Sequence, residues 1–364
     1  MQGRIHQYLF FMLAMLAGAT PVWADYKAGL AAYDRHDYKT AYNEWHALAQ
    51  KGDADGQFGL GRLYHNGYGV DQDYGQAKGW YEKAIVQGHS GAMTNLGLLY
   101  LYGEGVPQSL DVARAWFEKA VALKNVRGAY FLGLMHEEGL GFPKDAALAK
   151  TWYEKAAAPE HTGELGNAEA QFALGLMYHH GDGIPKDYVQ AVSWYRKAAD
   201  QGYDQAQDKL AWMYDNGLGV PKDYAQAFSW YRKAADQGNT HAQNCLGWDY
   251  EYGKGVAKDY KQALHWFALP AAHGDRFALF NIGLMYHYGY GVPKDDVKSF
   301  QLTLMSAIQG LPEAQNNVGY SFEKGLGVTK DIEKAKAWYR ASAAQGFAHA
   351  AEKLRRLEQN TQAQ

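Results

Sequence analysis

The chain is poor in cysteine, with Cys245 as the single one among 364 residues. One thiol cannot form a disulfide within its own chain, which excludes the disulfide-stapled folds on which many small exported proteins depend. The stability of the fold must therefore come from packing. A hydrophobic fraction of 47 %, rich in Trp and Tyr, is adequate for that.

The sequence also lacks a strong excess of charge. Its formal net charge is −3, which is not basic enough to favour nucleic acid or an acidic membrane surface. Beyond the N-terminus, no segment is long and apolar enough to cross a bilayer. We therefore expect neither a nucleic-acid partner nor a transmembrane segment in the mature chain.

The first 24 residues have the features of an export signal. Arg4 and His6 precede an apolar run over residues 8–17, which is too short to span a bilayer as a helix. The tripeptide Val-Trp-Ala at 22–24 has the small-x-small pattern of a cleavage site. We predict a signal peptide over 1–24, a mature chain that begins at Asp25, and a periplasmic or secreted location.

One pattern is repeated eight times along the chain. Each copy is centred on a small anchor residue, and the anchors are Gly61, Gly97, Gly133, Gly175, Ala211, Gly247, Gly283 and Gly319. Successive anchors are 36 residues apart, except that the step from the third to the fourth is 42. A fixed period of this length is typical of stacked supersecondary units, which present an extended surface. We therefore look for function in what that surface binds.

The fourth repeat shows why each unit is predicted to be two helices. Small and apolar residues recur at helical spacing over 168–180. Gly181 is placed to end this first helix in the left-handed conformation. Asp187 is expected to cap the second helix, with Gln190 completing a capping box. On the second helix, Trp194 is expected to be a buried core ring.

The two ends of the array differ from its interior. Residues 25–52 are predicted to form an N-terminal partial repeat, 53–346 the eight repeats, and 347–364 a C-terminal capping helix and tail. Terminal units that face water on one side are expected to be atypical in this way.

Three motifs of the fourth repeat resemble the Sel1-like repeat, a relative of the tetratricopeptide repeat. They are Leu-Gly-x-Met-Tyr at 174–178, Gly-x-Gly-Ile-Pro-Lys-Asp-Tyr at 181–188 and Trp-Tyr-x-Lys-Ala-Ala at 194–199. The resemblance covers residues 25–357. It implies an all-α, right-handed superhelical solenoid of about eight helix-turn-helix repeats, whose first helices line a concave face. It also implies a scaffold or adaptor for other proteins. Exported bacterial proteins that resemble this chain include factors for host-cell entry, immune-protein binders and partners of cell-wall enzymes.

Three departures interrupt the repeat pattern. An insertion at 159–164 lengthens the joint between the third and fourth repeats. Pro270 stands late in the second helix of the sixth repeat and is expected to interrupt its last turn. In the seventh repeat, Leu302-Thr303 replaces Trp-Tyr. These departures are either neutral drift or a local change of curvature.

Enzyme motifs are poorly matched. Ser321 and Lys324 have the Ser-x-x-Lys spacing of penicillin-binding proteins and β-lactamases, but neither Ser-Asp-Asn nor Lys-Thr-Gly accompanies them. The glycine pairs follow a helix, whereas a phosphate-binding loop follows a strand. His65, His179 and His287 share one repeat position, so they lie too far apart to share a zinc ion. We expect no catalytic residue, cofactor or metal, with a β-lactamase-like or penicillin-binding hydrolase as the alternative.

Two variable positions on the first helices are the candidate partner-binding sites. One directly follows the anchor, and the other lies four residues earlier on the same helix face. Aromatic and Arg side chains, which often dominate protein interfaces, recur there. The alternative is that they fill gaps between first helices. The predicted binding residues are Phe58, Arg62, Tyr130, Phe172, Trp212, Trp248, Phe280 and Tyr320.

The sequence thus predicts an exported, non-enzymatic and monomeric scaffold that binds a partner protein in its concave groove. Host interaction or virulence is one setting for this function, and regulation of a periplasmic cell-wall enzyme is another.

The first prediction concerns export. N-terminal sequencing of the protein from the periplasmic or culture fraction should begin at Asp25, because cleavage is expected after Ala24. Full-length protein retained in the cytoplasm would contradict the prediction.

Overall fold

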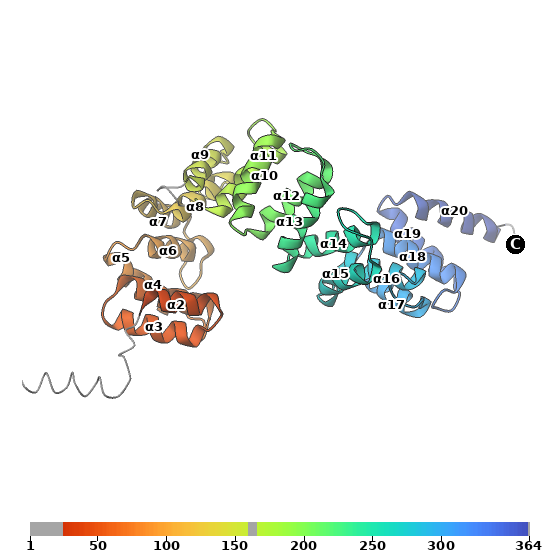
Figure 1. Ribbon diagram of the computed structural model, residues 1–364, viewed down its shortest axis with the longest axis horizontal. Helices are drawn as coiled ribbons and strands as arrows, with labels where there is room; N and C mark the ends of the chain where they lie inside the picture. Colours follow the sequence, from red (N-terminus) through yellow and green to blue (C-terminus); the bar gives the residue numbers. More distant parts are fainter. Residues whose placement is uncertain (1–24, 159–165, 363–364) are drawn as a thin grey trace, which may run out of the picture. The chain divides into compact units, whose positions relative to one another are not determined.

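The computed structural model describes residues 25–158 and 166–362, which form 19 α-helices and no strand within those ranges (Figure 1). The all-helical architecture predicted from the sequence is confirmed. The predicted signal peptide and the insertion at 159–164 lie outside the described residues. The helices fall into two compact units, divided after Ala170.

The helices of the first unit begin with an extra pair and continue with the first three repeats. They are α2 (Tyr26–Asp34), α3 (Tyr38–Gln50), α4 (Ala54–Asn66), α5 (Tyr74–Val86), α6 (Ser90–Tyr102), α7 (Leu110–Ala122), α8 (Val126–Glu138) and α9 (Ala146–Ala157). The leading pair was predicted as a partial repeat, and its Trp45 is fully buried.

The division between the units falls within α10, and the second unit continues to the closing helix α20. Its helices are α10 (Ala168–His180), α11 (Tyr188–Asp200), α12 (Asp204–Asn216), α13 (Tyr224–Asp236), α14 (Thr240–Tyr252), α15 (Tyr260–Ala272), α16 (Arg276–Tyr288), α17 (Asp296–Ile308), α18 (Pro312–Lys324), α19 (Ile332–Ala344) and α20 (Ala348–Gln362).

Each repeat is a helical hairpin closed by its caps. Gly181 has φ of +80° and its N–H donates to the Met177 carbonyl at 2.8 Å, so it ends α10 as predicted. The Asp187 carboxylate accepts from the Gln190 backbone N–H at 3.0 Å and caps α11. The predicted capping box is only half formed, because the Asp187 N–H donates to the Tyr178 carbonyl at 2.9 Å. That bond ties the two helices of the repeat together.

The core of nearly every repeat is one ring of the second helix lying on the anchor of the first. The rings Tyr81, Phe117, Tyr153, Tyr195, Phe267 and Tyr339 are fully buried. A Cβ added to the facing glycine would lie only 2.4–2.8 Å from ring atoms. In these six repeats the ring therefore occupies the space that a side chain on the anchor would need. The fifth repeat holds Ala211 and Tyr231 instead, both buried.

Trp194 is not the buried core ring that the sequence predicted. It is half-buried, and its neighbour Tyr195 occupies the core position. One residue is about 100° of rotation around a helix, so only one of the two rings can face the anchor. The Trp194 ring instead lies 3.7 Å from the Lys197 ammonium, a cation–π pair one turn along α11.

Buried glutamines connect successive repeats. Gln207 accepts a hydrogen bond from Gln237 of its own repeat at 2.8 Å and donates to the Ala199 carbonyl of the preceding repeat at 3.1 Å. Gln315 makes the same two bonds, to Gln345 and to the Ala307 carbonyl. Each such amide satisfies backbone and side-chain groups that burial would otherwise leave unpaired.

The expectation that Pro270 interrupts its helix is wrong. Helix α15 runs its full 13 residues through Pro270 to Ala272. Proline lacks the N–H that would have made one helical hydrogen bond, but only two helical residues follow Pro270, so little of the helix can be displaced. The Pro270 carbonyl accepts from the His273 and Asp275 N–H groups, both at 3.1 Å, and these bonds close the helix end.

The same substitution at two glycines of the first repeat should have opposite effects on stability. Gly61→Ala places a methyl group 2.4 Å from the Tyr81 ring, and we expect a loss of about 1–3 kcal/mol from overpacking. Gly79→Ala meets no atom within 4 Å on α5, so better helix propensity should give a gain of up to about 1 kcal/mol. Chemical denaturation of both variants measures the two signs. A stabilised Gly61→Ala variant would refute the ring-on-glycine constraint.

Candidate protein-binding site

The two candidate positions on the first helices differ in exposure. We call the residue directly after the anchor the outer position, and the residue four before it the inner position. None of the eight outer side chains is fully buried, and Trp248 and Tyr320 are 36 % and 38 % exposed. Four predicted binding residues occupy the outer position, namely Arg62, Trp212, Trp248 and Tyr320. The other four occupy the inner position, namely Phe58, Tyr130, Phe172 and Phe280.

The inner aromatics pack within and between repeats. Phe172 is only 9 % exposed, and its ring lies 5.7 Å from Tyr195 and 5.3 Å from Tyr203, where the next repeat begins. Phe58 is half-buried with its ring centre 4.4 Å from that of His89. Tyr130 lies 5.7 Å from Tyr153, and Phe280 packs against the core cluster of the eighth repeat. These four side chains are therefore engaged by the array itself.

The Arg62 guanidinium lies over three aromatic rings in the first unit. Its guanidinium carbon lies 4.3 Å above the Tyr33 ring and within 5.9 Å of the Phe58 and Trp45 rings. This packing orders the long side chain while leaving it half-buried. A preordered guanidinium can bind a carboxylate through two parallel hydrogen bonds.

Trp212 and Trp248 stand on consecutive first helices of the second unit but contact different neighbours. Trp212 stacks on His179 with ring centres 5.3 Å apart and planes at 27°. Trp248 meets the Phe267 core ring edge-on at 6.5 Å. Within the described residues the two indoles make no ring contact with each other. Trp212 is half-buried and Trp248 is 36 % exposed, so part of each indole surface remains accessible.

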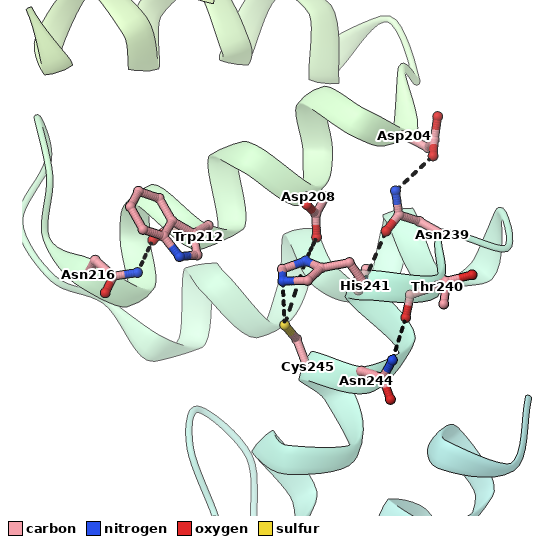
Figure 2. A network of polar contacts seen from close by, with 10 residues as sticks. Asp204, Asp208, Trp212, Asn216, Asn239, Thr240, His241, Asn244 and Cys245 are labelled. Atoms are coloured by element: carbon pink, nitrogen blue, oxygen red, sulfur yellow. Dashed lines mark hydrogen bonds and ion pairs between the residues drawn. The ribbon is translucent and has the colours of Figure 1, made fainter. Parts of the chain in front are cut away.

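A polar network joins the fifth and sixth repeats beside Trp212 (Figure 2). The Asp208 carboxylate, which is 5 % exposed, lies 2.6 Å from His241 Nδ1. The Cys245 sulfur lies 3.9 Å from Nδ1 and 3.8 Å from Nε2 of the same ring. One turn away, the Asn239 amide donates to Asp204 at 2.9 Å.

Asp208, His241 and Cys245 do not form a nucleophilic triad. In such a triad Nδ1 faces the carboxylate and only Nε2 faces the nucleophile. Here the sulfur is equally far from both nitrogens, so it lies off the hydrogen-bonding direction of Nε2. Burial also raises the pKa of the Cys245 thiol, whereas reactive cysteines have a lowered pKa. The network is therefore a structural link between repeats.

Tyr320 borders a cavity of about 450 Å³ between α16, α17, α18 and α20. Ser321, the serine of the Ser-x-x-Lys match, also lines it. The lysine of that match, Lys324, forms an ion pair with Glu323 at 2.9 Å and does not line the cavity. The motif therefore does not bring its serine and lysine together in this cavity.

The described part of the chain contains no cluster of three or more His, Cys, Asp or Glu side chains placed to hold a metal ion. Nor does any helix within it have the length and hydrophobicity needed to span a membrane.

Comparison with known proteins identifies the family. The model of the Sel1 repeat matches eight segments, at residues 54–89, 90–125, 126–158, 168–203, 204–239, 240–275, 276–311 and 312–347. The chain belongs to the Sel1 repeat family. The resemblance drawn from the sequence motifs is thus confirmed, and so is the solenoid fold that it implied.

Two solved structures with Sel1 repeats are similar over most of this chain. One is a protective antigen present in uropathogenic Escherichia coli strains, 36 % identical over 86 % of this chain, with a TM-score of 0.73. This chain spans 66 % of that antigen. The other is a Sel1 repeat protein from Oxalobacter formigenes, 32 % identical over 86 % of this chain and 89 % of its own, with a TM-score of 0.60. No match was found among curated proteins.

Sequence reasoning missed a buried carboxyl in the sixth Sel1 repeat. Asp249 is 7 % exposed, and its Oδ2 has no hydrogen-bond partner among the described residues. Burial, with a contribution from Asp215, raises the pKa of Asp249 to about 7. The signal was present in the repeat alignment, because the equivalent position holds Leu or Met in every other repeat except the eighth, which has Ser321.

The Asp208–His241 link should make the second unit sensitive to alkaline pH. The hydrogen bond to Asp208 and the contact with Cys245 raise the pKa of His241 from 6.5 to about 10. The folded state therefore binds this proton more tightly than the unfolded chain. Its stabilising contribution is complete below about pH 6.5 and is lost as pH rises through about 10.

NMR titration of the His241 ring measures this effect. In the Asp208→Asn variant we expect the pKa of His241 to fall toward 6.5, since the neutral amide no longer favours the imidazolium. An unchanged titration in this variant would show that the carboxylate does not hold the proton on the ring.

Proposed function

We propose that this protein is a non-enzymatic scaffold that binds an extended segment of a partner protein along its outer positions. The observation that carries the proposal is the exposure of Trp248 and Tyr320, at 36 % and 38 %, at one fixed position of the repeat. Large aromatic side chains left exposed at a repeated position are favoured anchors for a protein partner. The family supports the proposal, because the Sel1 repeat solenoid is a protein-interaction scaffold fold.

The outer residues offer complementary chemistry within each unit. Trp212 and Trp248 provide flat apolar surface with an indole N–H, and both are half held by a neighbouring ring. Because these rings are already ordered, their immobilisation on binding loses little entropy. In the first unit, Arg62 is preordered for an acidic group. We therefore expect a partner segment with apolar side chains and at least one carboxylate.

We further propose that the protein is exported and acts in contact with a host or with the cell envelope. The apolar N-terminal run and its small-x-small end support export. The similarity to a protective antigen of uropathogenic Escherichia coli supports a role that involves exposure to a host. Regulation of a periplasmic cell-wall enzyme would use the same face with a different partner.

Replacing Trp212 and Trp248 together by Ala should weaken partner binding without unfolding the repeats. We expect a loss of at least about 2 kcal/mol in binding free energy if the indoles are interface anchors. The melting temperature should change little, since neither ring fills the buried ring position. Crosslinking capture by the wild-type protein identifies the partner, and titration calorimetry with that partner then gives the affinity.

Two matched tryptophan variants are the controls. Trp230 is 7 % exposed, so Trp230→Ala should lower the melting temperature. Trp194 is half-buried on a second helix, so Trp194→Ala should leave the affinity unchanged. A double variant with wild-type affinity and a markedly lowered melting temperature would reject the proposed face.

A further inference from the structure

The seventh repeat has a place for a core ring but no ring. Thr303 stands where the other repeats hold Tyr or Phe, and its side chain is 4 % exposed. The glycine that makes room for a ring is still present, since a Cβ on Gly283 would lie 2.6 Å from Thr303 Oγ1. The anchor of the seventh repeat is therefore no larger than in the other repeats, and its side chain does not fill the space of the missing ring.

The polar partner of the missing ring is also still present. In the first and fourth repeats the core tyrosine hydroxyl lies 3.4 Å from His65 Nδ1 and 3.3 Å from His179 Nδ1. His287 occupies the same position in the seventh repeat. Because Thr303 provides no tyrosine hydroxyl, the His287 Nδ1 instead lies 2.9 Å from one carboxylate oxygen of Asp296. The other oxygen of Asp296 lies 3.4 Å from the Lys294 ammonium. The Asp296 charge is thus balanced by Lys294.

The resulting cavity of about 450 Å³ is lined mainly by hydrogen-bonding groups. The lining residues with hydroxyl groups are Tyr288, Ser299, Thr303, Tyr320 and Ser321, and Asn317 carries an amide. Lys353 of the closing helix α20 supplies an ammonium group. The cavity therefore offers several neutral donors and one cation to whatever enters it.

Lys353 lines this cavity and has no paired carboxylate among the described residues. It donates to the Asn316 side-chain oxygen at 3.3 Å and lies 5.0 Å from the Tyr320 ring, and no carboxylate in the described part of the chain forms an ion pair with it. The nearby Glu323 is bound at 2.9 Å by both Arg356 and Lys324. Burial lowers the pKa of Lys353, and the charge of Glu323 opposes this shift only in part.

We propose that the cavity at Thr303 binds a carboxylate group of the partner's peptide chain. A monoanion matches the single unpaired ammonium, and the hydroxyl and amide donors surround it. A phosphate dianion would leave one negative charge unbalanced, and a cation would be repelled by Lys353. This inference deepens the scaffold function proposed above and rests on it for the source of the carboxylate, which is either an acidic side chain or the end of a chain.

Three small probes separate these sources. N-acetylglutamate N-methylamide carries only the side-chain carboxylate, N-acetylglutamine only the chain-end carboxylate, and N-acetylglutamine N-methylamide neither. Each is titrated at constant ionic strength into protein labelled at Leu and Thr methyl groups. The methyls of Thr303, Leu284 and Leu326 report on the cavity, because all three residues line it. We expect saturable shifts with at least one acid and none with the neutral amide, and the tighter acid identifies the source.

Two variants test the cavity itself. Thr303→Tyr restores the ring found in five other repeats, so it should fill the cavity, keep the fold and weaken binding of the acid at least tenfold. Lys353→Met keeps the length of the side chain but removes the charge, and should have a similar effect. Lys330→Met removes an exposed lysine outside the cavity and should leave binding unchanged.

Equal shifts with the neutral amide, or wild-type affinity in a folded Thr303→Tyr or Lys353→Met variant, would overturn the proposal. The absence of saturable shifts with both acids would do the same. The test is independent of the outer tryptophans, so the Trp212→Ala, Trp248→Ala double variant should bind the acids normally. Failure of the tryptophan face and failure of the carboxylate site are thereby distinguished.

Discussion

The close approach of two helices, at a point where one of them has almost no side chain, is the constraint on which the rest of the structure depends. The ring of Tyr195 lies where a Cβ of Gly175 would be, and five other repeats have the same contact. This contact sets the distance and rotation of the second helix against the first. The hairpin bond from Asp187 to Tyr178 and the glutamine links then follow from a geometry that is already fixed.

Because these contacts fix each helical hairpin, the residues that can vary lie at the junctions between repeats and on the outer surface. At the inner position the side chains form specific hydrogen bonds, such as Thr94 with Asn125 at 3.0 Å and Asn244 with Asp275 at 3.1 Å. The pairs thus differ from one junction to the next. At the outer position the contacts with the preceding helices are made by rings, such as Trp212 on His179 at 5.3 Å and Arg62 over Tyr33 at 4.3 Å.

Much of the fold could be predicted because its determinants are local. Gly181 and Asp187 act within one turn of their own position, and both were assigned correctly. The choice between Trp194 and Tyr195 as core ring depends on how one helix is rotated against another, which adjacent aromatic residues do not reveal. Asp208 and His241 are 33 residues apart, so their contact requires the register of two repeats. The Thr303 substitution was visible, but its cavity also depends on Lys353 in the closing helix.

Because Lys353 lies outside the repeats, it restricts where the array can gain or lose a repeat. The glutamine links reach no further than the neighbouring repeat, so duplication or deletion of an interior unit requires no new kind of contact. The cavity at Thr303 is different, because it needs the seventh repeat, the eighth repeat and α20 in immediate succession. A unit gained between the eighth repeat and α20 would separate the ammonium from the threonine. The cavity is thus tied to the C-terminal end of the array, whatever number of repeats precedes it.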